Sequence, residues 1–431
     1  MNRLAREYRV FLECPRDMRV LLVTNMIYAF VLPVIEIFVA AYVMRNSHDV
    51  SKVVTYQLAI YAGDPFAFWL NGLLLGRMSI KRLYSVGMLL SAIAMLVMMS
   101  STVISPVAIA VSGLLMGIAS GLFWANRGFL ALSTTTDENR NYYYGVETFF
   151  LTITSVAVPA AIGWFIEATG KYGWMGGDRN DSYRIIAVCA LALTAAASLV
   201  INMGHYRNPP QTSFVFFRFH SLWKKMLSLA ALKGLAQGYL VTAPAMLIMM
   251  LVGQEGTLGL IQAAGGIVSS LMLYAVGRAS KPEHRVRVFA VGLLLFAAGS
   301  LVNMVMFNAT GVLIFMACLV LAKPILDLAY FPIQLLIIDT VSMIEERNEY
   351  AYIFNHEIGL FAGRLFGCGL FLILAVNISH IAALKYALPI IAILQIASIW
   401  VARNLISSAG KAKTGPLPMP PQVVEVVASR D

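Results

Sequence analysis

Charged side chains inside long apolar runs are the residues of this sequence that could do chemistry. A charge at the centre of a bilayer costs roughly 2.5–3.5 kcal/mol on insertion scales, so such residues tend to bind a ligand, carry a proton or pair with one another. The residues in question are Glu36, Asp64, Arg127, Glu147, Lys233, Lys323, Asp327, Glu357 and Arg364. Their depth and spacing decide which role the sequence predicts for each.

Glu36 and Asp64 are the acidic candidates for proton coupling. Asp64 lies near the middle of its apolar run, directly before Pro65, and Glu36 follows Pro33 by three residues. Loss of water favours the neutral form of a carboxylate, so a buried one can take up and release a proton near neutral pH. The alternative is a structural carboxylate that pairs with a neighbouring helix or with water.

Three deep cations, Lys233, Lys323 and Arg364, favour a ligand that carries an anionic group. Lys323 and Asp327 are four residues apart and would share one face of a helix. They could neutralise each other, or exchange partners with a charged ligand. Arg364 could instead neutralise Asp64 or Asp327 across a bundle of helices.

Arg127 and Glu147 lie near the ends of consecutive apolar runs. Opposite charges at such places predict an ion pair between neighbouring helices, and a gating role is the alternative. Elsewhere the sequence shows no metal-ligand pattern, no phosphate-binding Gly-rich loop and no hydrolase motif, so no metal and no cofactor are expected.

The runs that hold these residues predict an all-α, polytopic membrane protein. Of 431 residues, 59% are apolar and 13% are charged, against about 25% charged in an average soluble domain. Unbroken runs exclude the alternation of an outer-membrane β-barrel. Runs of about 20 residues suit spanning helices, and twelve are expected, at 20–44, 54–76, 84–104, 107–132, 145–166, 184–203, 226–252, 257–277, 287–307, 311–338, 352–377 and 381–405.

Lys and Arg residues indicate the orientation. With an even number of spans, 22 of the 32 fall on the side that holds both termini, and 5 on the other side. Cytoplasmic loops carry the excess of positive charge, so both termini are predicted to be cytoplasmic, in an integral protein of the cytoplasmic (inner) membrane. The net charge of +10 is then a topology signal and predicts no nucleic-acid partner.

Two loop motifs recur at nearly the same offset and suggest an internal repeat. Gly-Arg-x-Ser occurs at Gly76 and at Gly277, and Arg-Asn-x-Tyr occurs at Arg140 and at Arg347. We therefore predict two pseudo-symmetric six-helix bundles, at 20–203 and 226–405, joined by a cytoplasmic linker at 204–225. Residues 1–19 would form a cytoplasmic amino-terminal tail, and the Pro-rich segment 406–431 a disordered cytoplasmic tail.

This organisation resembles the major facilitator superfamily of secondary transporters. The family's loop pattern, Gly-x-Leu-x-Asp-Arg-x-Gly-Arg-Lys, is matched in part by Gly72, Leu74, Arg77 and Lys81, with Gly76 and Ser79 replacing the aspartate and the second glycine. The resemblance implies that helices 1, 4, 7 and 10 line a central cavity. The candidate lining residues are then Asn25, Tyr28, Trp124, Asn126, Lys233, Gln237, Tyr239, Lys323 and Asp327.

The resemblance also implies gating contacts near the loop motifs and on helix 11. Residues assigned to gating or to interhelical ion pairs are Arg77, Arg127, Glu147, Arg278, Glu357 and Arg364. Because the pattern's aspartate is replaced by Gly76, the sequence does not match the family's charge lock between helices 2 and 11.

The expected function is secondary active transport of a small anionic or zwitterionic organic solute by alternating access, as proton-coupled import by a monomer in a lipid bilayer. An exporter (a proton antiporter of the same family) is an alternative, although its helix-5 motif is matched only weakly by Val158-Pro159-Ala160-Ala161-Ile162-Gly163. An intramembrane enzyme or a lipid-handling protein, and a channel or signalling protein, are alternatives from other classes.

Overall fold

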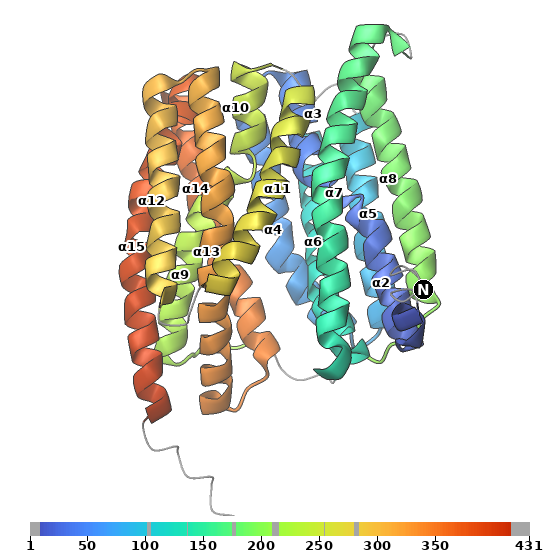
Figure 1. Ribbon diagram of the computed structural model, residues 1–431, viewed down its shortest axis with the longest axis vertical. Helices are drawn as coiled ribbons and strands as arrows, with labels where there is room; N and C mark the ends of the chain where they lie inside the picture. The colour runs from blue at the N-terminus through green and yellow to red at the C-terminus, as the bar shows by residue number, and fades with distance from the viewer. Residues whose placement is uncertain are drawn as a thin grey trace, which may run out of the picture.

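The computed structural model describes residues 9–100, 105–135, 137–174, 178–208, 215–253, 255–279 and 284–414. Within these residues the regular structure is helical, and the long helices stand side by side in one bundle (Figure 1). We call the end at which α2 begins and α15 ends the lower end, as it is drawn in Figure 1, and the opposite end the upper end.

The first spanning segment is broken near its middle. It consists of α2 (Arg16–Ala29), the π-helical segment η1 (Val34–Phe38) and α3 (Val39–Ser47). Pro33 immediately precedes η1 and has no N–H to donate, which interrupts the regular ladder of hydrogen bonds. The break turns Glu36, on η1, toward the interior of the protein.

The remaining helices of the first half are α4 (Val50–Leu74), α5 (Ile80–Ser100), α6 (Pro106–Thr134), α7 (Asp137–Tyr172) and α8 (Arg179–Asn202). Several begin at a side-chain cap: Asp49 accepts from Ser51 N at 2.8 Å, and Asp178 accepts from Asn180 N at 2.8 Å. Such caps satisfy backbone donors that a helix leaves free at its start.

The second half begins with another broken span, α9 (Ser221–Leu240) followed by α10 (Ala243–Leu251), whose Pro244 lies in its first turn. After it come α11 (Glu255–Ala279), α12 (Arg285–Met306), α13 (Ala309–Glu345), α14 (Glu349–Asn377) and α15 (His380–Thr414). Both broken spans are the first of their half and break beside a proline.

Eleven helical segments of the described residues are long and apolar enough to cross a membrane. The twelfth predicted span is α4, a 25-residue helix that falls outside this set. It carries Gln57, Asp64 and Asn71 in its run, and the first two of these line a cavity. The polarity of α4 therefore reflects its place in the interior.

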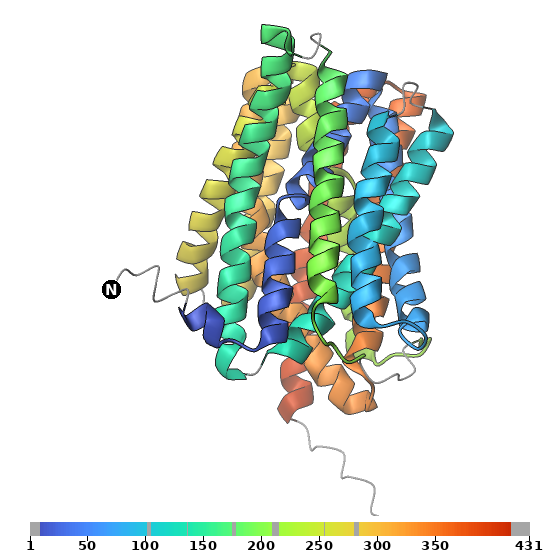
Figure 2. The same ribbon diagram turned by 90° about the vertical axis from the view of Figure 1, so that its right-hand side faces the viewer.

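The helices form two groups, α2–α8 and α9–α15, which meet along the middle of the molecule (Figure 1). Figures 1 and 2 both show α7 beside α11, one from each group. Glycines allow this contact, because a Cβ on Gly163 would lie 2.8 Å from the carbonyl oxygen of Glu255 and 3.1 Å from the Cα of Gly259. Small residues at such crossings let helix backbones approach closely.

Both predicted tails are shorter than the sequence suggested. The prediction of a disordered tail from residue 406 is wrong for residues 406–414, which continue α15 to Thr414, and residues 415–431 lie outside the described residues. At the other end, α2 already begins at Arg16. Hydropathy detects the apolar part of a span, whereas backbone hydrogen bonding carries the helix on into polar sequence.

Candidate functional site

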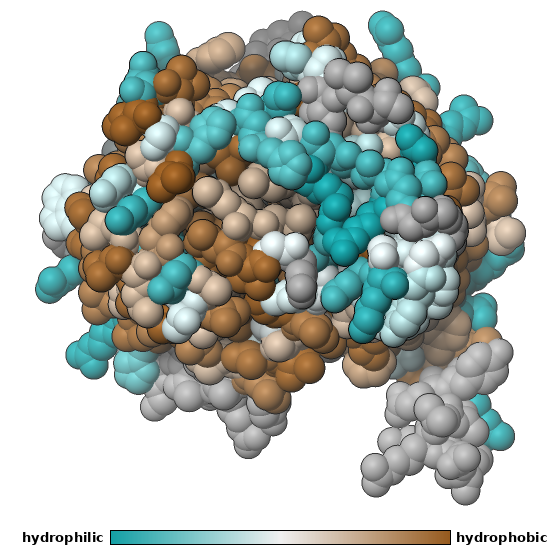
Figure 3. Space-filling view, turned by 90° about the horizontal axis from the view of Figure 1, so that it is seen from above, coloured by the Kyte–Doolittle hydropathy of each residue, from teal (hydrophilic) through white to brown (hydrophobic). Residues whose placement is uncertain are grey.

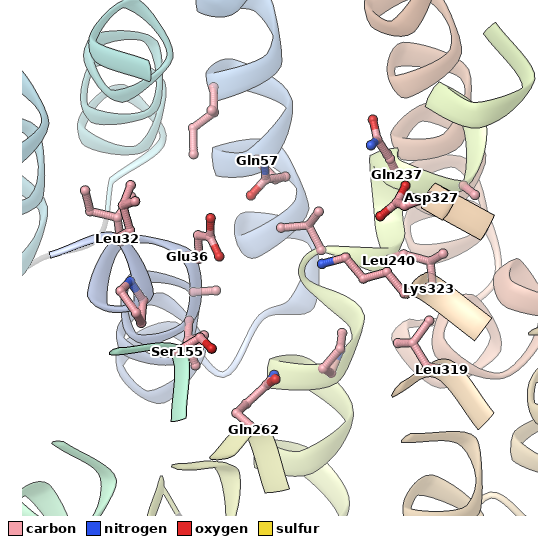
Figure 4. A pocket seen from close by; sticks show the side chains of 18 of the residues that line it. Leu32, Glu36, Gln57, Ser155, Gln237, Leu240, Gln262, Leu319, Lys323 and Asp327 are labelled. Carbon is pink, nitrogen blue, oxygen red and sulfur yellow. The ribbon is translucent and has the colours of Figure 1, made fainter. Parts of the chain in front are cut away.

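A cavity of about 550 Å³ lies between the two groups of helices. Side chains from η1, α4 and α6 of the first half line it, together with side chains from α9, α11 and α13 of the second half. Figure 4 shows Glu36 and Gln57 on one side of this space, Lys323 and Asp327 on the other, and Gln262 below them. The lining helices are more numerous than the four that the resemblance implied.

Eight of the predicted functional residues line the cavity: Tyr28, Glu36, Asp64, Trp124, Lys233, Gln237, Lys323 and Asp327. Gln57 and Gln262 also line it and were not predicted. An uncharged polar residue within an apolar run was the signal that could have found them.

Asn25, Asn126 and Tyr239 do not line the cavity, so that part of the prediction is wrong. Asn126 is fully buried and donates to Asn71 Oδ1 at 2.6 Å, and Tyr239 is fully buried and stacks on Phe371 with ring centroids 4.6 Å apart. Each lies on a cavity-lining helix but on a face turned toward a neighbouring helix. Residue type alone does not tell the two faces apart.

Asn25 belongs instead to a buried network around Glu147. Its amide donates to Glu147 Oε1 at 2.7 Å and to Tyr143 Oη at 3.0 Å. The predicted pair of Arg127 and Glu147 is bidentate, at 3.0 Å from Nε and 2.6 Å from Nη2. This network joins α2, α6 and α7 within the first half, and Glu147 is only 3% exposed.

Lys233 on α9 pairs with Asp327 on α13, with Nζ 2.9 Å from Oδ1. Of the two alternatives left open for Lys323 and Asp327, mutual neutralisation on one helix is therefore not formed. Lys233 Nζ also lies 4.0 Å from the ring centroid of Tyr330 and 4.1 Å from that of Phe331. Three partners thus hold the Lys233 ammonium at the edge of the cavity.

Arg364 on α14 joins the two halves. Its Nη1 lies 3.5 Å from Asp64 Oδ2 on α4 and 3.6 Å from Glu357 Oε2 on its own helix. Its guanidinium also donates to Gln237 Oε1, at 3.1 Å from Nη2, and lies over the ring of Tyr61 at 4.6 Å. Asp64, one of the two partners considered for Arg364 from the sequence, is therefore the one that pairs with it, and the pair connects α4 to α14.

Contacts between the halves lie above and below the cavity. At the upper end, Glu255 on α11 is fully buried and pairs with Arg45 on α3 and with Arg179 on α8, the latter at 3.1 Å. Hydrophilic residues gather over part of this end of the molecule (Figure 3). Toward the lower end, Tyr350 on α14 donates to the Phe68 carbonyl on α4 at 3.1 Å.

The cluster of Glu255 with two arginines was missed from the sequence. From the sequence, Arg45 and Arg179 are only positive charges of the loops on the side opposite the termini, and Glu255 lies just outside the predicted run 257–277. The available signal was an acidic residue directly before a spanning segment, on the same side of the membrane as the cations that could pair with it.

Arg77, the first arginine of the repeated motif, has no ion pair with another described side chain. Arg77 is exposed just after α4, and the side chain of Arg278, near the end of α11, lies outside the described set. The loop after α4 is held by Asn208, whose amide donates to the carbonyls of Leu75 at 2.7 Å and Met78 at 2.8 Å.

A helical bundle in two halves, with a charged cavity between them and contacts at both ends, defines a membrane protein of the secondary transporter class. The sequence model of the Major Facilitator Superfamily matches residues 20–363. The chain belongs to this superfamily, so it is an integral membrane transporter and not an enzyme. The intramembrane enzyme considered from the sequence is thereby excluded.

Known proteins support the same fold. A Bacillus subtilis (strain 168) protein described as uncharacterized protein YqgE is 22% identical over 388 residues, 86% of each chain. The structure of the nucleoside transporter NupG matches with a TM-score of 0.66 at 13% identity, covering 91% of this chain and 99% of that one. A bacterial homologue of the human lysosomal transporter Spinster, inward-facing and occupied, matches with a TM-score of 0.64 at 13% identity, covering 92% and 98%.

Proposed function

We propose that this protein imports a small anionic or zwitterionic organic solute across the cytoplasmic membrane as a proton-coupled, monomeric symporter. The observation that carries the proposal is the ion pair between Asp64 and Arg364, which joins the two halves at the wall of the cavity. A titratable group in that position can link protonation to the relative movement of the halves.

The proposed orientation has both termini in the cytoplasm, because the Lys and Arg residues concentrate on their side. The lower end then faces the cytoplasm and the Glu255 cluster faces outward. Alternating access requires that contacts on either side of the cavity open in turn. The Glu255 cluster and the contact of Tyr350 with Phe68 are the outer and inner contacts that would do so.

Asp64 is the proposed coupling residue. Its side chain is 14% exposed, and its Oδ1 has no hydrogen-bond partner among the described residues. The charged groups that face it are Arg364 and, beyond it, Glu357. Protonation of Asp64 would remove its ion pair and leave Arg364 to Glu357 alone. The link between α4 and α14 would then weaken, which lets the halves separate.

The anionic part of the solute is proposed to bind Lys323. Arg364 and Lys233 are each neutralised by carboxylates, whereas Lys323 is exposed to the cavity without an ion pair among the described residues. A cavity of about 550 Å³ lies within the range of sites for small organic ligands, roughly 300–1,000 Å³.

Uptake by proteoliposomes tests this proposal. Vesicles containing purified protein would be given a panel of labelled amino acids and organic acids, with and without an inward proton gradient. Gradient-driven accumulation is expected for the wild type, and the Asp64→Asn variant should retain exchange of the same solute while losing accumulation. Asp181→Asn is the matched control, because Asp181 is 40% exposed and, among the described residues, pairs only with Arg184 at the upper surface.

The exporter alternative uses the same cavity and predicts the opposite result. Vesicles loaded with the solute would then release it as protons enter them from outside. Accumulation that persists unchanged in Asp64→Asn would exclude Asp64 as the coupling residue.

A further inference from the structure

Two opposite charges face each other across the cavity without partners among the described residues. Glu36 projects from η1 of the first half and Lys323 from α13 of the second half, and both side chains point into the space between the halves (Figure 4). We propose that this pair selects a zwitterion, with the substrate's ammonium group on Glu36 and its carboxylate on Lys323. The inference rests on the transport function proposed above and narrows its substrate class.

The argument begins with the charge balance of the cavity. Lys233 is paired with Asp327, and Arg364 is paired with Asp64 and Glu357. These pairs account for the other charged groups among the described lining residues. Glu36 and Lys323 remain, one of each sign, and each side chain is exposed to the cavity although it lies within the bundle.

Each of the two charged residues lies near a proline in the chain. Glu36 lies in a π-helical segment that follows Pro33, and single turns of π-helix recur at functional sites. Lys323 directly precedes Pro324, within α13. Both side chains line the same cavity. The two groups therefore share one compartment, although they form no ion pair.

The surroundings suit a small dipolar ligand. Leu240 and Leu319 supply apolar surface near Lys323 (Figure 4). Gln57 lies near Glu36, and Gln262 lies below it. When the cavity closes and water leaves, each charge needs a partner, because an isolated buried charge is very unfavourable. A simple anion would satisfy Lys323 and leave Glu36 unpaired, and a simple cation would do the reverse. A zwitterion satisfies both.

Binding measurements on purified protein in nanodiscs test the proposal. The probes are glycine, β-alanine, 4-aminobutyrate and glycylglycine, with N-acetylglycine as the anion-only analogue and glycinamide as the cation-only analogue. At least one zwitterion should bind the wild type 10-fold or more tightly than either analogue. Glu36→Gln and Lys323→Ala should each weaken that binding 10-fold or more.

Three further variants separate binding from folding. The exchange of the two charges, Glu36→Lys with Lys323→Glu, should restore much of the zwitterion binding, since the ligand can reverse its direction in the cavity. Glu349→Gln and Lys224→Ala are controls, because both side chains are exposed at the lower end and neither lines the cavity. They should bind like the wild type.

The outcomes distinguish this inference from the proposed transport function. Equal affinity for N-acetylglycine and the zwitterions, unchanged binding in Glu36→Gln, or no binding of any zwitterion by the wild type would overturn the zwitterion site. Gradient-driven uptake of an organic acid that depends on Asp64 would then still support symport. Zwitterion binding that depends on Glu36 and Lys323 supports the inference, even where uptake ignores the proton gradient.

Discussion

Lys233 and Asp327, on adjacent helices of the second half, form an ion pair across 2.9 Å at the edge of the cavity. Their side chains are 16% and 32% exposed, so the pair is partly screened by water. Because Asp327 pairs with Lys233 on α9, Lys323 on the same helix as Asp327 stays available to a ligand. The ion pair therefore holds α9 to α13, and it also affects ligand binding indirectly by leaving Lys323 unpaired.

Removal of only one member of this pair should lower the free energy of unfolding by more than half of what removal of both members would cost. Lys233→Ala leaves the Asp327 carboxylate beside apolar side chains and should lower the free energy of unfolding by about 1–3 kcal/mol. The double variant Lys233→Ala with Asp327→Ala should lose less than the sum of the two single variants. Thermal unfolding in detergent measures all three. Strictly additive losses would show that the two residues do not interact in solution.

Glu255 is predicted to keep the upper end closed. Glu255→Gln removes the negative charge that attracts Arg45 and Arg179 of the other half, so the contact between the halves weakens and opening should be favoured. A cysteine introduced at Val241, which lines the cavity, should then react on the order of 10-fold faster with a membrane-impermeant maleimide added from outside.

That labelling experiment uses a background in which the native cysteines Cys14, Cys189, Cys318 and Cys368 are replaced. Asp181→Asn is the control, because its i,i+3 pair with Arg184 is exposed at the same end and exposed pairs contribute about 0–1 kcal/mol. An unchanged labelling rate in Glu255→Gln would remove the cluster's role in closure.

Much of this architecture could be predicted from the sequence. Apolar runs located the helices because a spanning helix must cover itself with apolar side chains. The same logic brought out Asp64, Lys323 and Glu36, since charges in such runs are expensive and lie where water or a partner can reach them. Hydropathy therefore predicted both the helices of the fold and the charged residues that were candidates for the site.

The sequence offered partners for some of those charges, such as Asp64 or Asp327 for Arg364, but it could not choose among them. Lys323 and Asp327 share a helix face by spacing, yet Asp327 pairs with Lys233, which is 94 residues away in the chain. Asn126 and Tyr239 belong to predicted lining helices, but rotation about the helix axis turns them toward neighbours. Such choices depend on how helices from distant segments rotate and pack, which a single sequence does not record.

The pair of Arg127 and Glu147 is predicted to serve stability. Glu147 accepts from Arg127, from Asn25 and from Tyr143, the last at 3.3 Å, so its carboxylate is a hub of the first half. Glu147→Ala should lower the free energy of unfolding by about 3–5 kcal/mol, because it leaves a largely buried arginine without its counter-charge. Glu147→Gln should lose less, since its amide oxygen can still accept.

Thermal unfolding together with uptake at a temperature where each variant is folded distinguishes this role from gating. A structural role predicts near-normal uptake by the folded Glu147→Gln protein. Strongly reduced uptake without loss of stability would assign the pair to gating.

The last prediction concerns Arg364, where geometry matters as much as charge. Its planar guanidinium reaches Asp64, Glu357 and Gln237 at once and lies over Tyr61. Lysine keeps the positive charge but has a single compact ammonium group, so it cannot make these contacts simultaneously. Arg364→Lys should therefore fold, with a loss of about 1–2 kcal/mol in the free energy of unfolding.

Its transport should be affected far more than its stability. If protons act through the Asp64–Arg364 link, a lysine that pairs with only one carboxylate uncouples Asp64 from α14, and gradient-driven accumulation should fall by 10-fold or more while exchange persists. Glu357→Gln tests the same argument from the other side: with its competitor neutral, Arg364 should hold Asp64 more firmly, and the pH at which accumulation is half-maximal should shift downward, because the ionised form of Asp64 is then favoured. Wild-type accumulation in Arg364→Lys would mean that charge alone suffices at this position, and the coupling assigned to the link between α4 and α14 would have to be abandoned.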